Sequence, residues 1–394
     1  MCRFLVYVSA AGARPMLLGD VLTKPTHSLV MQAFSAGSTP GFSAANNAVF
    51  NADGCGVAWW SLDGKRVFLF KTTSPAWSDK NLADIAAFVE SHVIIGHVRA
   101  ASRGSVVSFE NTHPFRYGRL AFVHNGHIES FGPLRRVFSA RLSEEAFLAV
   151  KGLTDSEHAF ALLLTRLRDS GRAEPFAPAE LVSAMRATIA DILALLDEAG
   201  VASGFTSLNF CLSDGETVIV TRFCDRWPAI PPPSLYFAFP TFAELALEFG
   251  GGGGGGGGEV APSDGSASAA PATAAAPAAV AQEVGAVVGA SDAYGGVDVA
   301  LQRRDARWLR DEAFLAASRA TARQRTLLVA SEPATAGAHV KWLTLPANAM
   351  LTYSRSGGGV PELTRLDSLL PAAAGAGAGA VPSAASGASG DAGC

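Results

Sequence analysis

Residues 1–8 of the chain read MCRFLVYV, an apolar run that predicts a buried β-strand with a cysteine at its start. Removal of Met1 would leave Cys2 carrying both a thiol and a free α-amine. Because such an amine has a reference pKa of about 8, it can accept the thiol proton through a bridging water and activate the sulfur. Taken alone, Cys2 could be an accident of the start codon, so its role depends on the residues downstream.

Two low-complexity segments set the domain organisation of this chain of 394 residues, of which 49% are hydrophobic. Residues 250–300 contain a glycine run followed by an Ala/Pro/Ser/Gly tract, and residues 371–394 have a similar composition. Neither segment can bury enough apolar surface to offset its chain entropy. We therefore predict one folded unit with its main part at 2–249, a disordered insert at 250–300, completing strands within 301–370 and a disordered tail at 371–394.

Charge and hydropathy exclude several classes of protein. The formal net charge is -4 and the only basic cluster is Arg303–Arg310, so no nucleic-acid surface is expected. No apolar run approaches the ~20 residues of a membrane helix, and the apolar stretch after Met1 is too short for a signal peptide. Cleavage of such a peptide would also discard Cys2, so we expect a cytoplasmic protein with a small-molecule substrate.

The predicted strands and helices occur in blocks. Asp-Gly pairs at 63–64 and 214–215 separate apolar runs and predict β-hairpins with type I′ turns. Helices are predicted after a cap at Ser78, after a capping box of Thr154 and Glu157, and before a stop at Gly200. Further strands are expected at 93–99, 120–125, 234–239, 326–330 and 349–353. This grouping favours an α+β layered sandwich with antiparallel sheets over a doubly wound sheet.

Polar residues at the ends of three predicted elements are candidates for substrate binding. Arg99 ends a strand, where its guanidinium fork suits a carboxylate, although a single arginine is more typical of a surface. Asn125 and Gly126 end another strand. An Asn-Gly pair usually forms a turn, but an amide beside a glycine N–H also suits an oxyanion hole. Asp155 opens a helix, where it could cap the helix or pair with a substrate ammonium group.

With Cys2, these residues fit one reaction, the attack on the side-chain carbonyl of a bound amino acid. Arg99 would take the α-carboxylate and Asp155 the α-ammonium, while Cys2 attacks the γ-carbonyl. Asn125 and Gly126 would stabilise the oxyanion, and water would release glutamate from the thioester. The reaction needs no cofactor.

Histidines at positions 97, 113, 124 and 127 raise the question of a metal site. His124 and His127 do not have the i, i+4 spacing of helical ligands, and no acidic or cysteine pair completes a tetrahedral set. We therefore expect no metal. His113, which precedes Pro114, is instead a candidate for bracing the substrate pocket.

In this order and spacing, the motifs resemble the class II glutamine amidotransferases, a family of N-terminal nucleophile hydrolases. The matching stretches are MCR (1–3), DGCG (53–56), GHVR (96–99), NTHPF (111–115), HNG (124–126) and TDSE (154–157). The resemblance implies a four-layer αββα sandwich, with the nucleophile, the oxyanion hole and the head-group residues at the positions named above. Ser102 stands where the family commonly has a threonine in the pocket, so it is a further candidate for substrate binding.

A second set of motifs is similar to the amidotransferase-like subunits of the fungal glutathione degradation complex: VLTKPTHS (21–28), SPAW (74–77), LNF (208–210), SLYF (234–237) and VASEP (329–333). That likeness implies cleavage of the γ-glutamyl bond of glutathione to glutamate and Cys-Gly, with a metallopeptidase-like partner subunit. We expect no acceptor domain after residue 240, which favours hydrolysis over synthesis. The alternatives are a hydrolase of glutamine or of another γ-glutamyl compound, as in the ergothioneine pathway, and a non-catalytic regulatory subunit.

Overall fold

A computed structural model describes residues 2–34, 50–102, 104–241, 244–245, 325–335, 340–357 and 360–370. The predicted insert at 250–300 and the predicted tail at 371–394 lie outside the described residues, as do residues 301–324.

The first sheet has β1 (Arg3–Ser9) near its centre, and β1 begins one residue after Cys2. Strand β1 pairs antiparallel with β6 (Val93–Val98) and with β12 (Thr326–Ala330), so the end of β6 that leads into Arg99 lies beside the start of β1. Arg3 of β1 lies opposite Val98 of β6. The strand order is β13 (Leu343–Thr344), β11 (Tyr236–Ala238), β12 (Thr326–Ala330), β1 (Arg3–Ser9), β6 (Val93–Val98), β3 (Cys55–Trp60) and β4 (Val67–Thr72).

The second large sheet is also antiparallel and carries Asn125 and Gly126 on β8. Its order is β15 (Glu362–Arg365), β14 (Ala349–Ser354), β10 (Thr217–Arg222), β9 (Ser207–Ser213), β8 (Leu120–His127) and β7 (Phe115–Tyr117). A small third sheet pairs β2 (Met16–Leu17) with β5 (Glu90–Ser91). Strands from beyond residue 325 thus contribute to both large sheets.

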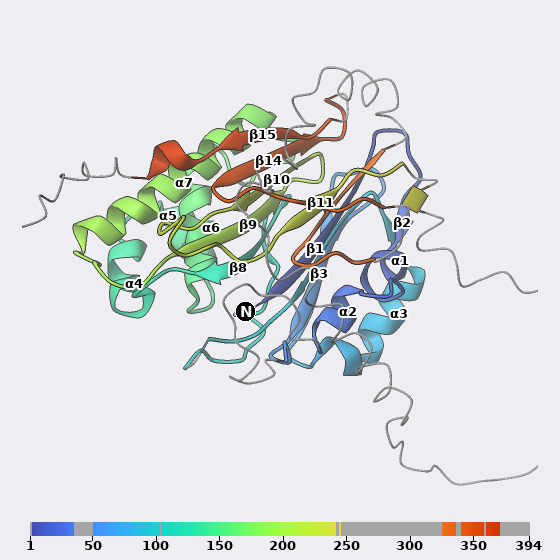
Figure 1. Cartoon of the computed structure of the whole chain (residues 1–394), viewed down its shortest axis with the longest axis horizontal. Coiled ribbons are helices and arrows are strands. Elements are labelled where there is room, and N and C mark those ends of the chain that lie inside the picture. The colour runs from blue at the N-terminus through green and yellow to red at the C-terminus, as the bar shows by residue number, and fades with distance from the viewer. Residues whose placement is uncertain are drawn as a thin grey trace, which may run out of the picture.

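Helices cover the outer faces of the two large sheets and give four layers (Figure 1). The first sheet is covered by α1 (Leu18–Leu22), α2 (Leu29–Gln32) and α3 (Lys80–Phe88). The second is covered by α4 (Phe131–Ser139), α5 (Glu144–Ala149), α6 (Asp155–Arg166) and α7 (Pro178–Glu198). Short 3-10 turns lie at η1 (Ala76–Ser78) and η5 (Asp367–Leu369). The α+β, four-layer αββα prediction is confirmed.

The alternation of side chains along β1 explains why this apolar strand lies at the centre. Phe4, Val6 and Val8 join the core between the two sheets, whereas Leu5 and Tyr7 join the core under α1 to α3. All five side chains are almost completely buried. Because β1 is apolar on both faces, both faces must be covered, and here the second sheet covers one and the helix layer covers the other.

The predicted type I′ turns are wrong, although both hairpins form. A type I′ turn needs positive φ at both central residues. Among the described residues, Gly64 and Gly215 have positive φ, at 70° and 88°, but Asp63 and Asp214 do not. The Asp63 carboxylate accepts the Lys65 N–H at 3.0 Å. This bond forms a local aspartate turn in which Asp63 keeps a negative φ.

One predicted helix cap is wrong, and one predicted capping box is incomplete. The cap of α3 is Asp79 and not Ser78, because the Asp79 carboxylate accepts the Leu82 N–H at 2.9 Å. Thr154 caps α6 as predicted, by accepting the Glu157 N–H at 3.2 Å. The Glu157 carboxylate does not complete a capping box, since it accepts the N–H groups of Lys151 and Gly152 instead. The stop of α7 at Gly200 is confirmed, with φ at 67°.

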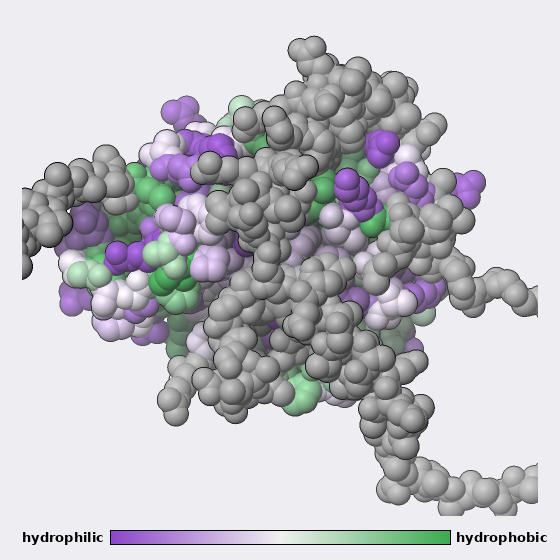
Figure 2. Space-filling model, in the orientation of Figure 1, coloured by the Kyte–Doolittle hydropathy of each residue, from purple (hydrophilic) through white to green (hydrophobic). Residues whose placement is uncertain are grey.

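Within the described ranges, none of the helices combines the length and the apolar character that a bilayer crossing requires. On the face seen in Figure 2, hydrophilic and hydrophobic residues are interspersed over the described part of the chain.

Candidate active site

Cys2 lies against the backbone of the segment that follows β6. Its Sγ accepts the Ala100 N–H at 3.4 Å and lies 3.5 Å from the Ala100 carbonyl oxygen. The antiparallel pairing of β1 with β6 brings Ala100 to this position, although the two residues are 98 positions apart in the chain. The thiol is therefore placed one residue from Arg99.

The surroundings of Cys2 favour the neutral thiol over the thiolate. Burial raises the pKa of the Cys2 thiol, and the Ala100 N–H and the charges of Arg99 and Arg3 lower it in part. A thiol in this state needs a base when it attacks, as an N-terminal nucleophile does. Cys2 is half-buried, whereas the other described cysteines are buried within the sheets or directly after them, as predicted for Cys55 and Cys211.

Arg99 is 3% exposed, and part of its guanidinium has no partner among the residues that the structure describes. Its Nη2 donates to Ser105 Oγ at 2.8 Å and to the Val106 carbonyl at 3.2 Å. Its Nη1 is buried and has no hydrogen-bond partner among the described residues. A buried, charged donor without a partner is costly unless a ligand completes it, and a carboxylate is the acceptor that fits a guanidinium best.

Asp53 was not predicted as a site residue, yet it fixes the backbone on either side of Ala100. Its carboxylate accepts the Ala101 N–H at 2.7 Å, and its own N–H donates to the Arg99 carbonyl at 3.1 Å. The neighbouring Gly54 has φ at 106°, which a residue with a side chain rarely adopts. The DGCG stretch of the sequence held this signal, but without a role for the aspartate.

Asn125 and Gly126 lie within β8 and not in a turn. The Asn125 side chain donates from Nδ2 to Ser331 Oγ at 3.4 Å, and its Oδ1 is buried without a partner among the described residues. A Cβ at Gly126 would collide with the Ser207 carbonyl oxygen of β9. Glycine is therefore required here by the close approach of the neighbouring strand.

Asp155 connects the start of α6 to the end of β8. One carboxylate oxygen accepts the Ile128 N–H at 2.9 Å and the other accepts the Ser156 N–H at 2.8 Å. The side chain thus holds the backbone two residues after Gly126. Its remaining lone pairs are what could meet a substrate ammonium group, since each carboxylate oxygen accepts more than one hydrogen bond.

The remaining two predicted residues lie in different surroundings. Ser102 is exposed, in the loop that follows Ala101. His113 is 3% exposed, and its ring centroid lies 4.2 Å from that of His97. Burial lowers the pKa of His113 well below its ordinary value, and neither ring nitrogen is paired among the described residues. His97 in turn contacts the His124 carbonyl at 3.3 Å, so this histidine pair lies next to the peptide that precedes Asn125.

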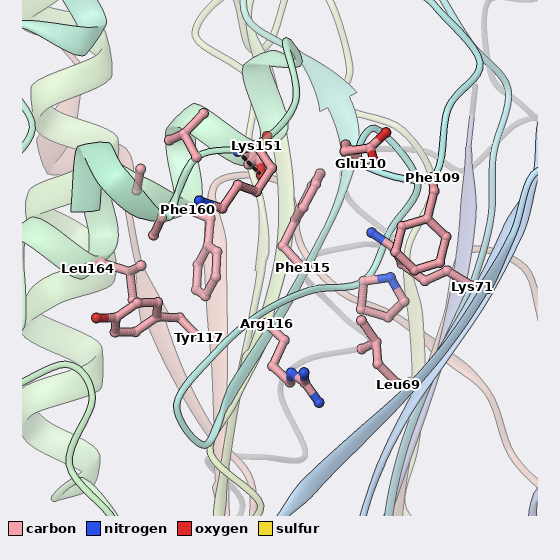
Figure 3. A pocket seen from close by; sticks show the side chains of 15 residues that line it. Leu69, Lys71, Phe109, Glu110, Phe115, Arg116, Tyr117, Lys151, Phe160 and Leu164 are labelled. Atoms are coloured by element: carbon pink, nitrogen blue, oxygen red, sulfur yellow. Dashed lines mark hydrogen bonds between the residues drawn. The ribbon is translucent and has the colours of Figure 1, made fainter. Parts of the chain in front are cut away.

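A separate cavity of about 640 Å³ lies by β4 and β7 and is lined by none of the predicted site residues. Figure 3 shows the Lys71 ammonium group beside the Phe109 ring, 4.5 Å from its centroid. Burial lowers the pKa of Lys71 to about 8. The charged residues of this lining are of both signs: Lys71, Glu110, Arg116, Lys151 and Glu157.

An αββα sandwich with a cysteine directly before its central strand, and with an Asn-Gly pair on the facing sheet, is the architecture of an N-terminal nucleophile hydrolase. A family model described as "Glutamine amidotransferases class-II" matches residues 27–230. The chain belongs to the class II glutamine amidotransferases.

Individual relatives agree with this family. The chain is 37% identical over 237 residues to "Probable glutamine amidotransferase DUG3" of Saccharomyces cerevisiae, an alignment that covers 57% of this chain and 64% of that protein. It is 32% identical over 121 residues to a glutamine–fructose-6-phosphate aminotransferase of Chlamydia muridarum, which covers 30% of this chain and 18% of that enzyme. The chain therefore spans less than two thirds of these relatives.

A solved structure of a glutamine aminotransferase class-II domain protein from Silicibacter pomeroyi is also similar to this chain. The match has a TM-score of 0.48 at 20% identity and covers 94% of this chain and 100% of the other.

Proposed function

We propose that the protein hydrolyses γ-glutamyl amide bonds with Cys2 as the nucleophile, and that its substrate is glutathione. The observation that carries this proposal is the placement of the Cys2 thiol against Ala100, the residue next to the buried Arg99, whose Nη1 has no partner in the described part of the chain. The Cys2 thiol and the Arg99 guanidinium are thus close to each other. This arrangement suits a substrate whose carboxylate and reacting carbonyl are a few bonds apart.

Removal of Met1 would supply the base. The free α-amine of Cys2 would take the thiol proton through a water as Sγ attacks the γ-carbonyl, and the Asn125 Nδ2 and the Gly126 N–H would donate to the oxyanion. Collapse of the tetrahedral intermediate would release the amine leaving group, which takes a proton from the α-ammonium. Water activated by the same amine would then cleave the thioester and release glutamate.

The head-group contacts explain why glutathione and glutamine would enter by the same route. Both present a free α-carboxylate and α-ammonium on a γ-linked glutamyl unit, for which Arg99 and Asp155 are the proposed receptors. They differ only in the leaving group. The likeness to the fungal subunits supports Cys-Gly as that group and a metallopeptidase-like protein as a partner subunit.

Glutamate release from glutathione, glutamine and γ-glutamyl dipeptides tests the proposal, with and without a co-purified peptidase subunit. We expect glutathione to be cleaved fastest, and expect a Cys2→Ala protein to release no glutamate. Intact-mass analysis provides the second test, because a retained Met1 would block the amine. Glutamate release by the Cys2→Ala protein would show that the nucleophile is elsewhere.

A further inference from the structure

The segment that follows β12 runs beside the start of β1 and contacts it through backbone and side-chain hydrogen bonds. The regular pairing of these strands ends at Leu5 and Ala330, and Ser331 still donates its N–H to the Phe4 carbonyl at 3.0 Å. The next residue, Glu332, then reaches Arg3 with its side chain. The VASEP stretch of the sequence therefore lies beside the residues that adjoin the nucleophile.

Glu332 is held from several sides although it is only 3% exposed. Its Oε1 accepts the Arg3 Nε–H at 3.0 Å, and its Oε2 lies 2.8 Å from His27 Nε2. The Gln32 side chain donates to the Glu332 carbonyl at 3.2 Å and to the His27 carbonyl at 3.0 Å. A carboxylate this deeply buried is tolerated only when it is paired, and here the pairs also fix its position.

Arg3 connects Glu332 to the backbone of Cys2. Its Nη1 donates to the Cys2 carbonyl at 3.1 Å, while its Nε donates to Glu332. Because a guanidinium is planar and rigid, fixing Nε on a carboxylate also fixes where Nη1 points. Cys2 precedes the first residue of β1, so this bond holds its backbone where the strand pairing has not yet begun.

We propose that Glu332 is a positioning residue for the Cys2 nucleophile, acting through Arg3 on the Cys2 carbonyl. This inference rests on the proposed role of Cys2. Two of the described contacts of Cys2 are complementary anchors: Arg3 fixes its backbone, and the Ala100 N–H, at 3.4 Å, fixes its sulfur. Loss of the first anchor lets Cys2 turn away from Ala100 toward solvent.

The test compares Glu332→Ala with the wild-type protein by two readouts that should move in opposite directions. We expect kcat for glutathione to fall roughly 10-fold to 100-fold with little change in KM, because a misplaced reacting group loses turnover. We expect iodoacetamide to alkylate Cys2 faster, measured on the Cys2 peptide by mass spectrometry. Release of Cys2 from burial lowers its thiol pKa, and each unit gives about tenfold more thiolate below the pKa.

Two further variants keep the result interpretable. Glu332→Gln keeps the shape and one acceptor for Arg3, so it should fold and show the same two changes at smaller size. Asp214→Asn alters another buried acid, which accepts the Thr217 N–H of the β9–β10 turn and the Phe176 N–H before α7, and which has no described contact with Cys2. It should lower the melting temperature and leave Cys2 alkylation unchanged.

The alkylation readout separates this inference from the proposed function. Equal Cys2 alkylation rates in the wild-type, Glu332→Ala and Glu332→Gln proteins would overturn the positioning role, whatever the protein hydrolyses. A wild-type protein that does not cleave glutathione, with Cys2 alkylation accelerated in Glu332→Ala, would overturn the substrate assignment and support the positioning role.

Discussion

The side chain of Asn125 donates to the hydroxyl of Ser331, at 3.4 Å, across 206 positions of the chain. The same hydroxyl accepts the Phe4 N–H at 3.0 Å. Ser331 therefore connects the strand that follows the nucleophile to the amide proposed for the oxyanion hole, and it lies on a segment beyond residue 325. Both large sheets must be assembled before this connection exists.

Replacement of Ser331 by alanine should lower both the stability of the protein and the kcat of the reaction. The Phe4 N–H and the Asn125 amide would each lose a buried acceptor, at a cost of about 1 to 3 kcal/mol in the free energy of unfolding. We expect kcat to fall as well, because the Asn125 side chain loses its orientation. Urea denaturation and steady-state kinetics measure the two effects. Ser213→Ala is the matched control, since the Ser213 hydroxyl is also buried and, among the described residues, bonds within the β9–β10 turn. This variant should lose stability alone.

Arg99→Lys should raise KM for γ-glutamyl substrates. Lysine keeps the charge but loses the fork, and one charge-assisted hydrogen bond is worth about 1.5 to 3 kcal/mol, or roughly 10-fold to 100-fold in affinity. The control is a substrate whose glutamyl α-carboxylate is amidated. The wild-type protein should use it poorly, and Arg99→Lys should add no further loss. An equal loss for both substrates would contradict carboxylate binding by Arg99.

Gly126→Ala should destabilise the pairing of β8 with β9. The added Cβ would meet the Ser207 carbonyl and come within 2.6 Å of His124 Nε2, neither of which is free to move. We expect a loss of roughly 1 to 3 kcal/mol in the free energy of unfolding, with lower activity. Gly132→Ala is the control: its Cβ would meet nothing within 4 Å, on helix α4. That variant should be neutral or gain about 1 kcal/mol.

The stability of the protein should fall as the pH is lowered below about 6.5. Burial lowers the pKa of His97 to about 3 and also lowers the pKa values of its neighbours His113 and His124. Below that pH, these histidines therefore bind protons in the unfolded chain but stay neutral in the folded protein. The stabilisation is complete above the unfolded pKa and is lost as the pH falls toward the folded value, by about 1.4 kcal/mol for each unit of difference.

Urea denaturation at several pH values measures this dependence, and His97→Gln removes one of the groups responsible. Its free energy of unfolding should vary less steeply with pH than that of the wild-type protein. The absolute stability of the variant does not matter for this comparison, because only the slope reports on protons. An identical slope in both proteins would exclude His97 as a contributor.

Short sequence motifs predicted turns and helix ends well where a single residue type determines the local backbone conformation. The Asp-Gly hairpins, the Thr154 cap and the Gly200 stop all depend on neighbours within a few positions, and all form. The predicted turn type and the predicted cap of α3 were wrong because an aspartate side chain accepts a nearby backbone N–H in each case. The Asp63 carboxylate accepts an N–H within its own turn, and the Asp79 carboxylate caps α3 in place of the adjacent Ser78.

The sequence by itself determined the α+β class with antiparallel sheets, because strand period and glycine turns are local or nearly so. The order of its motifs, through the resemblance to the class II glutamine amidotransferases, implied the αββα layers and the polar residues proposed for the chemistry. Only the tertiary structure decided what surrounds those residues. It placed Cys2 on the backbone of Ala100, gave the Nη1 of Arg99 no partner within the described ranges, and brought Ser331 and Glu332 to the start of β1. Such contacts join positions that are far apart along the chain, so they follow from sheet pairing and burial and from no local pattern in the residues.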